Sequence, residues 1–450
     1  MSDPVPEPVF EALSRGGGGA GATGHLRAAQ FGKHLLLLRR VVDAARGARH
    51  PDADRARDAY DLLAEAQEHA PGRVATVLRH PTVGVWARRT ALALAGHRPE
   101  RPRVTGLAAI AAVAALRGGM EARLEVPLDG PTAPLPSLGR ALVGVESRRV
   151  STGRARFETT GGRAVLRSGD GPEVTVPADP HEDAPGWHAL RRMVAEHRGQ
   201  RLTLLLDDQD PDRMPGADLV AHRLGAAELA HWRRDLEQAW RLLVDHHWTV
   251  AAETAETVVT LTPISAPGGR THTSATARHA FGNLGLSTPP GPTLLALTFA
   301  HEVQHAKLTA LLDLVELTLP EDGSRFYAPW RPDPRPASGL FQGVYAHLGV
   351  AGFWRRHRHT VAGDEAARAH ADFAHWRRST ADAAEALADS GRLTAEGKRF
   401  LAATDRTLRA WLAEPVPAPA EAAAESAART HREHWHARHG WPGSGGRSGA

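Results

Sequence analysis

The sequence predicts an α+β fold that is predominantly helical, with helical parts at both ends and a small mixed or antiparallel sheet between them. Apolar residues recur at helical spacing over 25–120 and again over much of 266–414. Between 121 and 265 the apolar period shortens toward that of strands. Hydrophobic residues make up 42% of a 450-residue chain, which is an ordinary share for a globular protein with a sizeable core.

The first half of the chain divides into a short lead-in, a helical region and the start of the mixed region. Residues 1–24 contain a run of glycines and are predicted to be flexible. Residues 25–120 are predicted to be helical and end at the break Gly118-Gly119. In the mixed region, strand-like segments flank Thr160-Gly161-Gly162, which is the pattern of a β-hairpin.

The second half is predicted to return to helices. The mixed region, 121–265, holds a helix over 225–245 and a strand over 258–262. Residues 266–414 begin with a strand-like stretch over 274–286 and continue as a helical metal-binding region. Residues 415–450 form a Pro/Ala linker and a polar, His-rich tail that is predicted to be disordered.

Composition excludes several classes of site. The chain has no cysteine, so disulfides, thiolate zinc sites, iron–sulfur clusters and cysteine nucleophiles are excluded. The formal net charge of +4 is spread along the chain, and no nucleic-acid-binding motif is present. We expect neither a membrane span nor a signal peptide, and therefore a cytoplasmic location. The sequence does not indicate an oligomeric state.

The most informative stretch is His301-Glu302-Val303-Gln304-His305, an H-E-x-x-H motif within an apolar helical pattern. Two histidines four residues apart lie one turn apart on one face of a helix, so both imidazoles can reach one metal ion. Glu302 lies beside the same ion, where it acts on a metal-bound water or orients a ligand. The helix is expected to run from about residue 291 to 317.

Two candidates supply the third metal ligand. His347 lies in a second apolar helical stretch, 42 residues after His305, and two packed helices would bring it to the pair. Glu321, just past the end of the motif helix, is the alternative. The long zinc-protease motif is excluded, because Leu308 and Leu311 stand where it needs glycine and histidine. Lys307, His357 and His359 are predicted to lie in solvent.

Three separated segments resemble the HExxH motif-containing peptide-modification proteins, which occur beside ribosomally made peptide natural products. They are 299–308 (FAHEVQHAKL), 326–336 (FYAPWRPDPRP) and 343–347 (GVYAH). The residues 280–287 before the motif helix are similar as well. The resemblance implies an iron(II)- and 2-oxoglutarate-dependent oxygenase that hydroxylates a β-carbon in a precursor peptide. It also implies that His301, His305 and His347 hold the iron.

A bidentate 2-oxoacid needs a cation for its far carboxylate, preferably a guanidinium. Arg331 and Arg335 are the candidates, because neighbouring prolines stiffen their loop. Their alternative role is a surface ion pair with Asp333. Two other functions stay open: a zinc metallopeptidase with Glu302 as general base, and a non-catalytic scaffold that binds a peptide.

Overall fold

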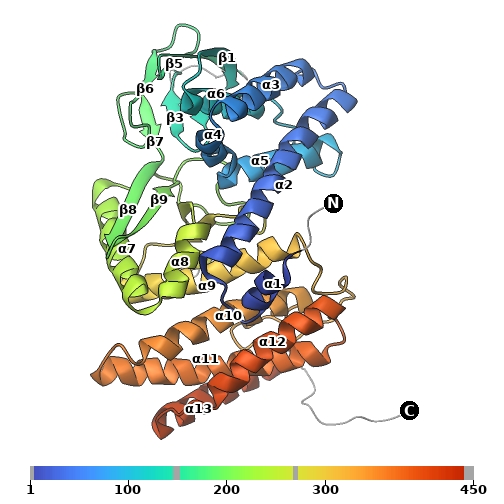
Figure 1. Ribbon diagram of the computed structural model, residues 1–450, viewed down its shortest axis with the longest axis vertical. Coiled ribbons are helices and arrows are strands. Elements are labelled where there is room, and N and C mark those ends of the chain that lie inside the picture. Colours follow the sequence, from blue (N-terminus) through green and yellow to red (C-terminus); the bar gives the residue numbers. More distant parts are fainter. Residues whose placement is uncertain (1–4, 145–152, 267–271, 440–450) are drawn as a thin grey trace. The chain divides into compact units, whose positions relative to one another are not determined.

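The computed structural model describes residues 5–144, 153–266 and 272–439, and these confirm an α+β fold that is mainly helical (Figure 1). The chain forms two compact units. Unit 1 comprises residues 1–26, 238–257 and 291–450, and unit 2 comprises residues 27–237 and 258–290. Each unit is therefore built from segments that are far apart in the sequence.

Unit 1 is helical and contains the H-E-x-x-H motif. Its helices are α1 (Glu7–Ser14), the start of α2 (Gly19–Gly47), the end of α7 (Ala226–His246), α8 (Trp248–Thr257), α9 (Pro292–Leu312), α10 (Ala337–His357), α11 (Gly363–Asp389), α12 (Ala395–Leu412) and α13 (Ala418–His439). The motif helix is α9, and it packs against α8 and α10. In turn α10 packs on α11, and α11 contacts both α12 and α13.

Unit 2 combines helices with three small sheets. Its helices are the rest of α2, α3 (Ala53–His69), α4 (Pro71–Leu78), α5 (Pro81–Leu94), α6 (Gly106–Gly118) and the first part of α7. Its strands are β1 (Ala122–Pro127), β2 (Thr132–Leu135), β3 (Gly139–Leu142), β4 (Arg154–Thr160), β5 (Arg163–Arg167), β6 (Val174–Val176), β7 (Trp187–Ala189), β8 (Arg191–His197), β9 (Gln200–Leu206), β10 (Thr260–Pro263), β11 (Ser274–Ala275) and β12 (Asn283–Leu286).

Two of the sheets are antiparallel and one is mixed. The antiparallel sheets have the strand orders β1-β4-β5-β6 and β2-β3-β7. In the mixed sheet, β11-β12-β10-β9-β8, strand β10 pairs in parallel with both β9 and β12. The predicted hairpin joins β4 to β5 through Gly161 and Gly162, whose φ angles of 59° and 76° suit glycine in a two-residue turn.

The structure differs from the sequence prediction at both ends of the chain. Residues 7–14 form α1, and α2 already begins at Gly19, within the segment predicted to be flexible. In the predicted disordered tail, residues 418–439 form α13, while 440–450 lie outside the described residues. Helix α13 is anchored by Glu421, which pairs with Arg377 at 2.7 Å and with Arg378 at 2.6 Å on α11. Arg377 and Arg378 lie 43 residues or more away in the chain. Their contacts stabilise a helix whose own composition does not predict one.

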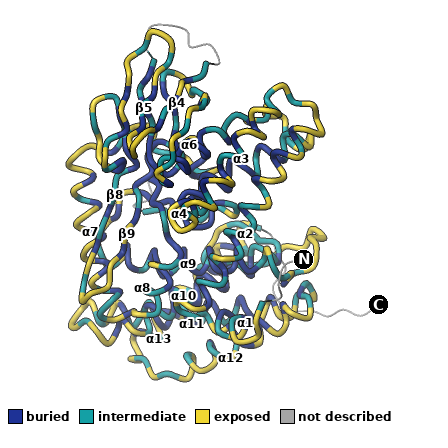
Figure 2. The backbone as a smooth tube through the Cα atoms, turned by 45° about the horizontal axis from the view of Figure 1, so that its top comes forward, coloured by how far each residue is buried: buried dark blue, intermediate teal, exposed yellow. Residues whose placement is uncertain are grey.

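Helices α9 and α10 are the most deeply buried elements around the motif, as the dark segments in Figure 2 show. Helix α9 is apolar on nearly every face, which is typical of a helix enclosed by its neighbours. It begins at Pro292, a favoured first helical residue, and ends at Leu312, five residues before the predicted end. Within the described ranges, no helix has a long enough stretch of low-charge apolar residues to cross a membrane.

Candidate metal centre

Three predicted ligands, His301 and His305 on α9 and His347 on α10, lie together inside unit 1. The ring centroid of His301 lies 4.8 Å from that of His305 and 5.1 Å from that of His347. Imidazole nitrogens bind a divalent metal at about 2.0–2.1 Å, so two rings that share one ion have centroids roughly 5 Å apart. The two separations therefore match those of histidines on a common metal.

The ring nitrogens are not yet arranged as a complete set of ligands. Across residues 5–144, 153–266 and 272–439, no three His, Asp or Glu side chains form a group that could hold a metal as they stand. His301 is central, because it lies against both of the other rings. Binding one ion through all three histidines consequently needs side-chain rotation around His301.

Hydrogen bonds fix the tautomer of two of the histidines. The Nδ1–H of His347 donates to the carbonyl oxygen of Gly343 at 2.8 Å. The Nδ1–H of His305 donates to Oε1 of Gln342 at 3.0 Å, and Gln342 in turn donates to Thr309 Oγ1 at 3.3 Å. Partners of this kind orient metal-binding histidines and leave Nε2 with its lone pair. Both rings are thus prepared to bind through Nε2.

Burial keeps two of the rings neutral. Burial lowers the pKa of His301 to about 4; Glu302 raises this pKa and His305 lowers it, with smaller effects. Burial also holds the pKa of His347 well below its ordinary value, and the neighbouring His301 lowers it further. A neutral imidazole is the form that binds a metal. At neutral pH these two rings can therefore bind a metal ion without first losing a proton.

Two tryptophans enclose His347. The Trp330 ring stacks on it at 4.2 Å with an angle of 15° between the planes, and the Trp376 ring lies at 4.8 Å, tilted by 31°. Trp330 comes from the proline-rich loop between α9 and α10, and Trp376 comes from α11. The loop is itself attached to α13, since Tyr327 OH and His431 Nδ1 are hydrogen-bonded at 2.8 Å. Helix α13, within the His-rich tail, therefore contacts the loop that carries Trp330.

Trp330 can take this position only because residue 343 is glycine. A Cβ atom on Gly343 would lie 2.2 Å from the Trp330 ring. We expect Gly343→Ala to displace Trp330 from His347 and to destabilise unit 1 by about 1–3 kcal/mol, as overpacking of a core does. Thermal unfolding and tryptophan fluorescence would measure both effects.

Gly339→Ala, on the same helix, is the matched control. The atoms nearest to its Cβ would belong to the flexible side chain of Arg335, at 3.0 Å, and alanine favours the helix. Equal melting temperatures for the Gly343→Ala and Gly339→Ala variants would contradict the proposed packing of Trp330.

Glu302 is buried beside His301, with its Oε1 3.9 Å from His301 Nε2. Its carboxylate thus lies next to the nitrogen that would bind the metal, as the motif predicts. Glu321, the alternative third ligand, is exposed and accepts a hydrogen bond from Ser338 at 3.0 Å. The ring contacts therefore favour His347 over Glu321 as the partner of the motif histidines.

Arg331 and Arg335 both pair with Asp333. Arg331 Nε donates to Asp333 Oδ1 at 3.0 Å, and Arg335 lies 3.6 Å from Asp333 Oδ2. Burial raises the pKa of Asp333, but the two guanidiniums outweigh it and lower this pKa overall. The arginines lie in the loop of Trp330, and about half of the Arg331 side chain is exposed. The ion pairs with Asp333 correspond to the alternative role that was predicted for Arg331 and Arg335 from the sequence.

Two sequence predictions about neighbouring residues are wrong. Lys307 is not solvated, because it is 1% exposed and its Nζ lies 2.7 Å from Glu253 Oε2 on α8. Lys307 also donates to the backbone carbonyl of Gly17 at 3.2 Å. His357 is buried and stacks on Phe353 at 5.2 Å, whereas His359 is exposed as predicted.

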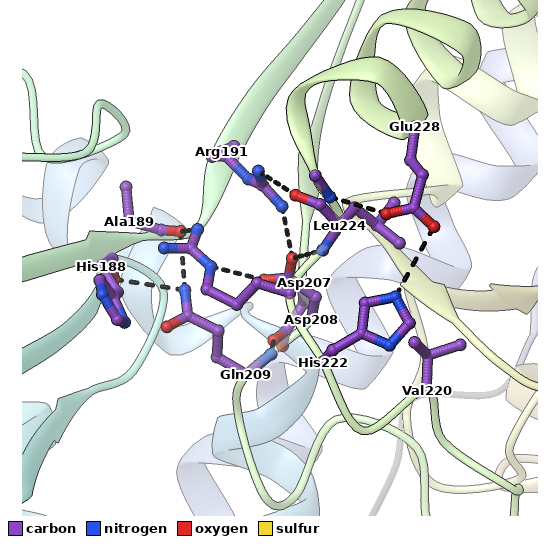
Figure 3. A network of polar contacts seen from close by, with 12 residues as sticks. His188, Ala189, Arg191, Asp207, Asp208, Gln209, Val220, His222, Leu224 and Glu228 are labelled. Atoms are coloured by element: carbon purple, nitrogen blue, oxygen red, sulfur yellow. Dashed lines mark hydrogen bonds and ion pairs between the residues drawn. The ribbon is translucent and has the colours of Figure 1, made fainter.

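A second polar cluster, in unit 2, was not singled out from the sequence (Figure 3). It follows β9. The acidic run Asp207-Asp208-Gln209-Asp210 is the sequence feature that could have indicated it. Arg191 pairs with Asp208, and Arg223 lies 3.5 Å from the same carboxylate. Gln209 donates to the carbonyl of Ala189 at 2.7 Å. These contacts attach the loop to β7 and β8, which is a structural role.

Comparison with known proteins does not add an assignment: no protein-family model and no curated protein sequence matches the chain.

Proposed function

We propose that the protein is an iron(II)- and 2-oxoglutarate-dependent oxygenase that hydroxylates a β-carbon in a ribosomally made peptide in the cytoplasm. The observation that carries the proposal is the contact of the His301 ring with those of His305 and His347, at the separations of a shared metal site. The resemblance to the HExxH peptide-modification proteins supports the choice of reaction. Histidine nitrogens suit iron(II) as well as zinc.

In this proposal His301, His305 and His347 hold the iron through their Nε2 atoms. Gln342 and the Gly343 carbonyl orient two of the rings, and Trp330 shields His347 from water. Iron(II) with O₂ and 2-oxoglutarate supplies the oxidation, in which a C–H bond becomes C–OH while 2-oxoglutarate yields succinate and CO₂. Three histidine ligands would leave further coordination positions of the iron for these reactants.

Glu302 orients a ligand or a water beside His301, and its charge favours a bound cation. Arg331 and Arg335 are proposed to bind the far carboxylate of 2-oxoglutarate. To do so, they leave Asp333 and pair with this carboxylate instead. The exposure of Arg331 supports this, since a surface ion pair contributes only about 0–1 kcal/mol and is readily exchanged.

The mass of the product peptide tests the proposal. The protein would be co-produced with each short peptide encoded beside its gene, and the peptides analysed by mass spectrometry. We expect one peptide to gain about 16 Da, or about 18 Da under ¹⁸O₂, with the new oxygen on a β-carbon. The purified reaction should require added 2-oxoglutarate and release succinate in equal amount.

The same experiment separates the other two functions. The closeness of Glu302 to His301 Nε2 also suits a zinc peptidase, in which Glu302 is the general base. That enzyme would give two fragments whose masses sum to the peptide plus one water, without 2-oxoglutarate. A peptide that is bound but unchanged in mass by the iron-loaded protein would contradict both enzymes and indicate a scaffold.

A further inference from the structure

A second cavity of unit 1 lies along a different face of α9 from the motif histidines. It has a volume of about 190 Å³ and is lined by the turn between α1 and α2 and by parts of α8, α9, α10 and α12. Helix α9 contributes Ala300, Val303 and Gln304 to its wall. Drug-sized ligands occupy roughly 300–1,000 Å³, so this space suits a smaller molecule.

The inner part of the cavity contains buried polar atoms without hydrogen-bond partners. Gln304 is 3% exposed, and its Nε2 donates to the Gly16 carbonyl at 2.9 Å, which fixes the amide orientation. Within the described chain, Gln304 Oε1 is buried and accepts no hydrogen bond, and the buried Nε2 of His247 has no partner either. Burial lowers the pKa of His247 to about 3, so this imidazole is neutral. A buried acceptor without a donor destabilises the protein, and a bound molecule that donates to it would remove this cost.

The outer part of the cavity carries an excess of positive charge. Arg15, Arg355 and Arg356 line it and are partly or fully exposed. Arg15 lies 3.8 Å from Glu11, and the one carboxylate among the lining residues, Glu253, is paired with Lys307. Arg355 shares the carboxylate of Glu414 with Arg358, so two guanidiniums face one negative charge there. Arg356 donates to the His246 carbonyl at 3.4 Å and lies over the face of Trp248. The carboxylate of a bound molecule would neutralise part of this positive charge.

The cavity wall also has apolar surface. Phe353 of α10 and Trp411 of α12 contribute it, and Gly349 and Gly352 present backbone without a side chain at two positions of α10. A Cβ on Gly349 would lie 2.4 Å from the Ala300 carbonyl, so this glycine also sets the close approach of α9 and α10.

We propose that this cavity binds a small carboxylic acid that also carries an N–H or O–H donor, such as an amino acid or a 2-hydroxy acid. The donor reaches Gln304 Oε1, beside which His247 Nε2 is the second unpartnered atom of the cavity, and the carboxylate lies among Arg15, Arg355 and Arg356. A 2-oxo acid without a donor leaves Gln304 Oε1 unsatisfied, so we expect 2-oxoglutarate to bind more weakly than a donor-bearing acid. The site is separate from the candidate metal centre and does not depend on the proposed reaction.

Calorimetric titration of the metal-free full chain tests the site. The probes are the twenty L-amino acids, the 2-hydroxy acids L-lactate and L-malate, and 2-oxoglutarate. We expect at least one amino acid or hydroxy acid to bind saturably, and its methyl ester and the matching 2-oxo acid to bind roughly tenfold more weakly or not at all. The amino-acid and hydroxy-acid series identify which donor the site prefers.

Two variants locate the binding and a third serves as a control. Val250→Phe fills the cavity from α8 and should abolish binding, and Arg356→Ala should weaken it roughly tenfold. Arg409→Ala removes an exposed arginine of α12 that pairs with Asp405 and does not line the cavity, and it should leave the affinity unchanged. Melting temperatures would show that all three variants fold. The proposal is overturned if no probe binds, if Val250→Phe binds as well as the unaltered protein, or if 2-oxoglutarate binds as tightly as the best donor-bearing acid.

Discussion

Replacing His301 with alanine should remove the metal from the protein. His301 is the ring that lies against both His305 and His347, so its loss leaves two histidines without their common neighbour. We expect iron bound after anaerobic loading to fall from about one equivalent per chain to less than about a tenth, because two remaining ligands hold a metal weakly. Elemental analysis after gel filtration measures this, and peptide hydroxylation should fall in parallel.

His359→Ala is the control for this prediction. His359 is an exposed histidine of the same unit, and its loss should leave the iron content unchanged. Full iron content in the His301→Ala variant would show that the metal, if any, is bound elsewhere.

Replacing Lys307 with methionine should strongly destabilise unit 1. Lys307 is fully buried and pairs with Glu253 at 2.7 Å, while Glu253 also accepts a hydrogen bond from the Gly19 backbone at 3.0 Å. Removing one partner leaves an uncompensated buried charge, which costs about 3–5 kcal/mol. Chemical unfolding should show a loss of this size for Lys307→Met and for Glu253→Met.

The double variant distinguishes the ion pair from simple packing. When both charges are replaced by methionine, no buried charge remains, so most of the stability should return. The exposed pair Arg409–Asp405 provides a comparison, since breaking it should change stability by only about 0–1 kcal/mol. Additive losses in the Lys307→Met/Glu253→Met double variant would contradict this account of the pair.

The parts of the fold that depend on local sequence were predictable. The hairpin around Gly161-Gly162 follows from turn chemistry, and the motif helix follows from its apolar period and from Pro292. The proximity of His301 and His305 follows from helix geometry alone. The placement of His347 beside them needed one further assumption, that α9 and α10 pack against each other, which the structure confirms.

The parts that depend on distant partners could not be predicted. Nothing near Lys307 in the sequence indicates Glu253, which lies 54 residues earlier and on another helix. Helix α13 likewise depends on Arg377 and Arg378, so its polar composition alone indicated a tail. Gln304 and His247 form a shared cavity only after four helices and a turn have packed.

X-ray absorption at the iron edge of the anaerobically loaded protein would measure directly whether three histidines hold iron. We expect three imidazole nitrogens at roughly 2.1 Å, falling to two in the His347→Ala variant. An iron environment with no imidazole scattering, or one that His347→Ala leaves unchanged, would contradict it.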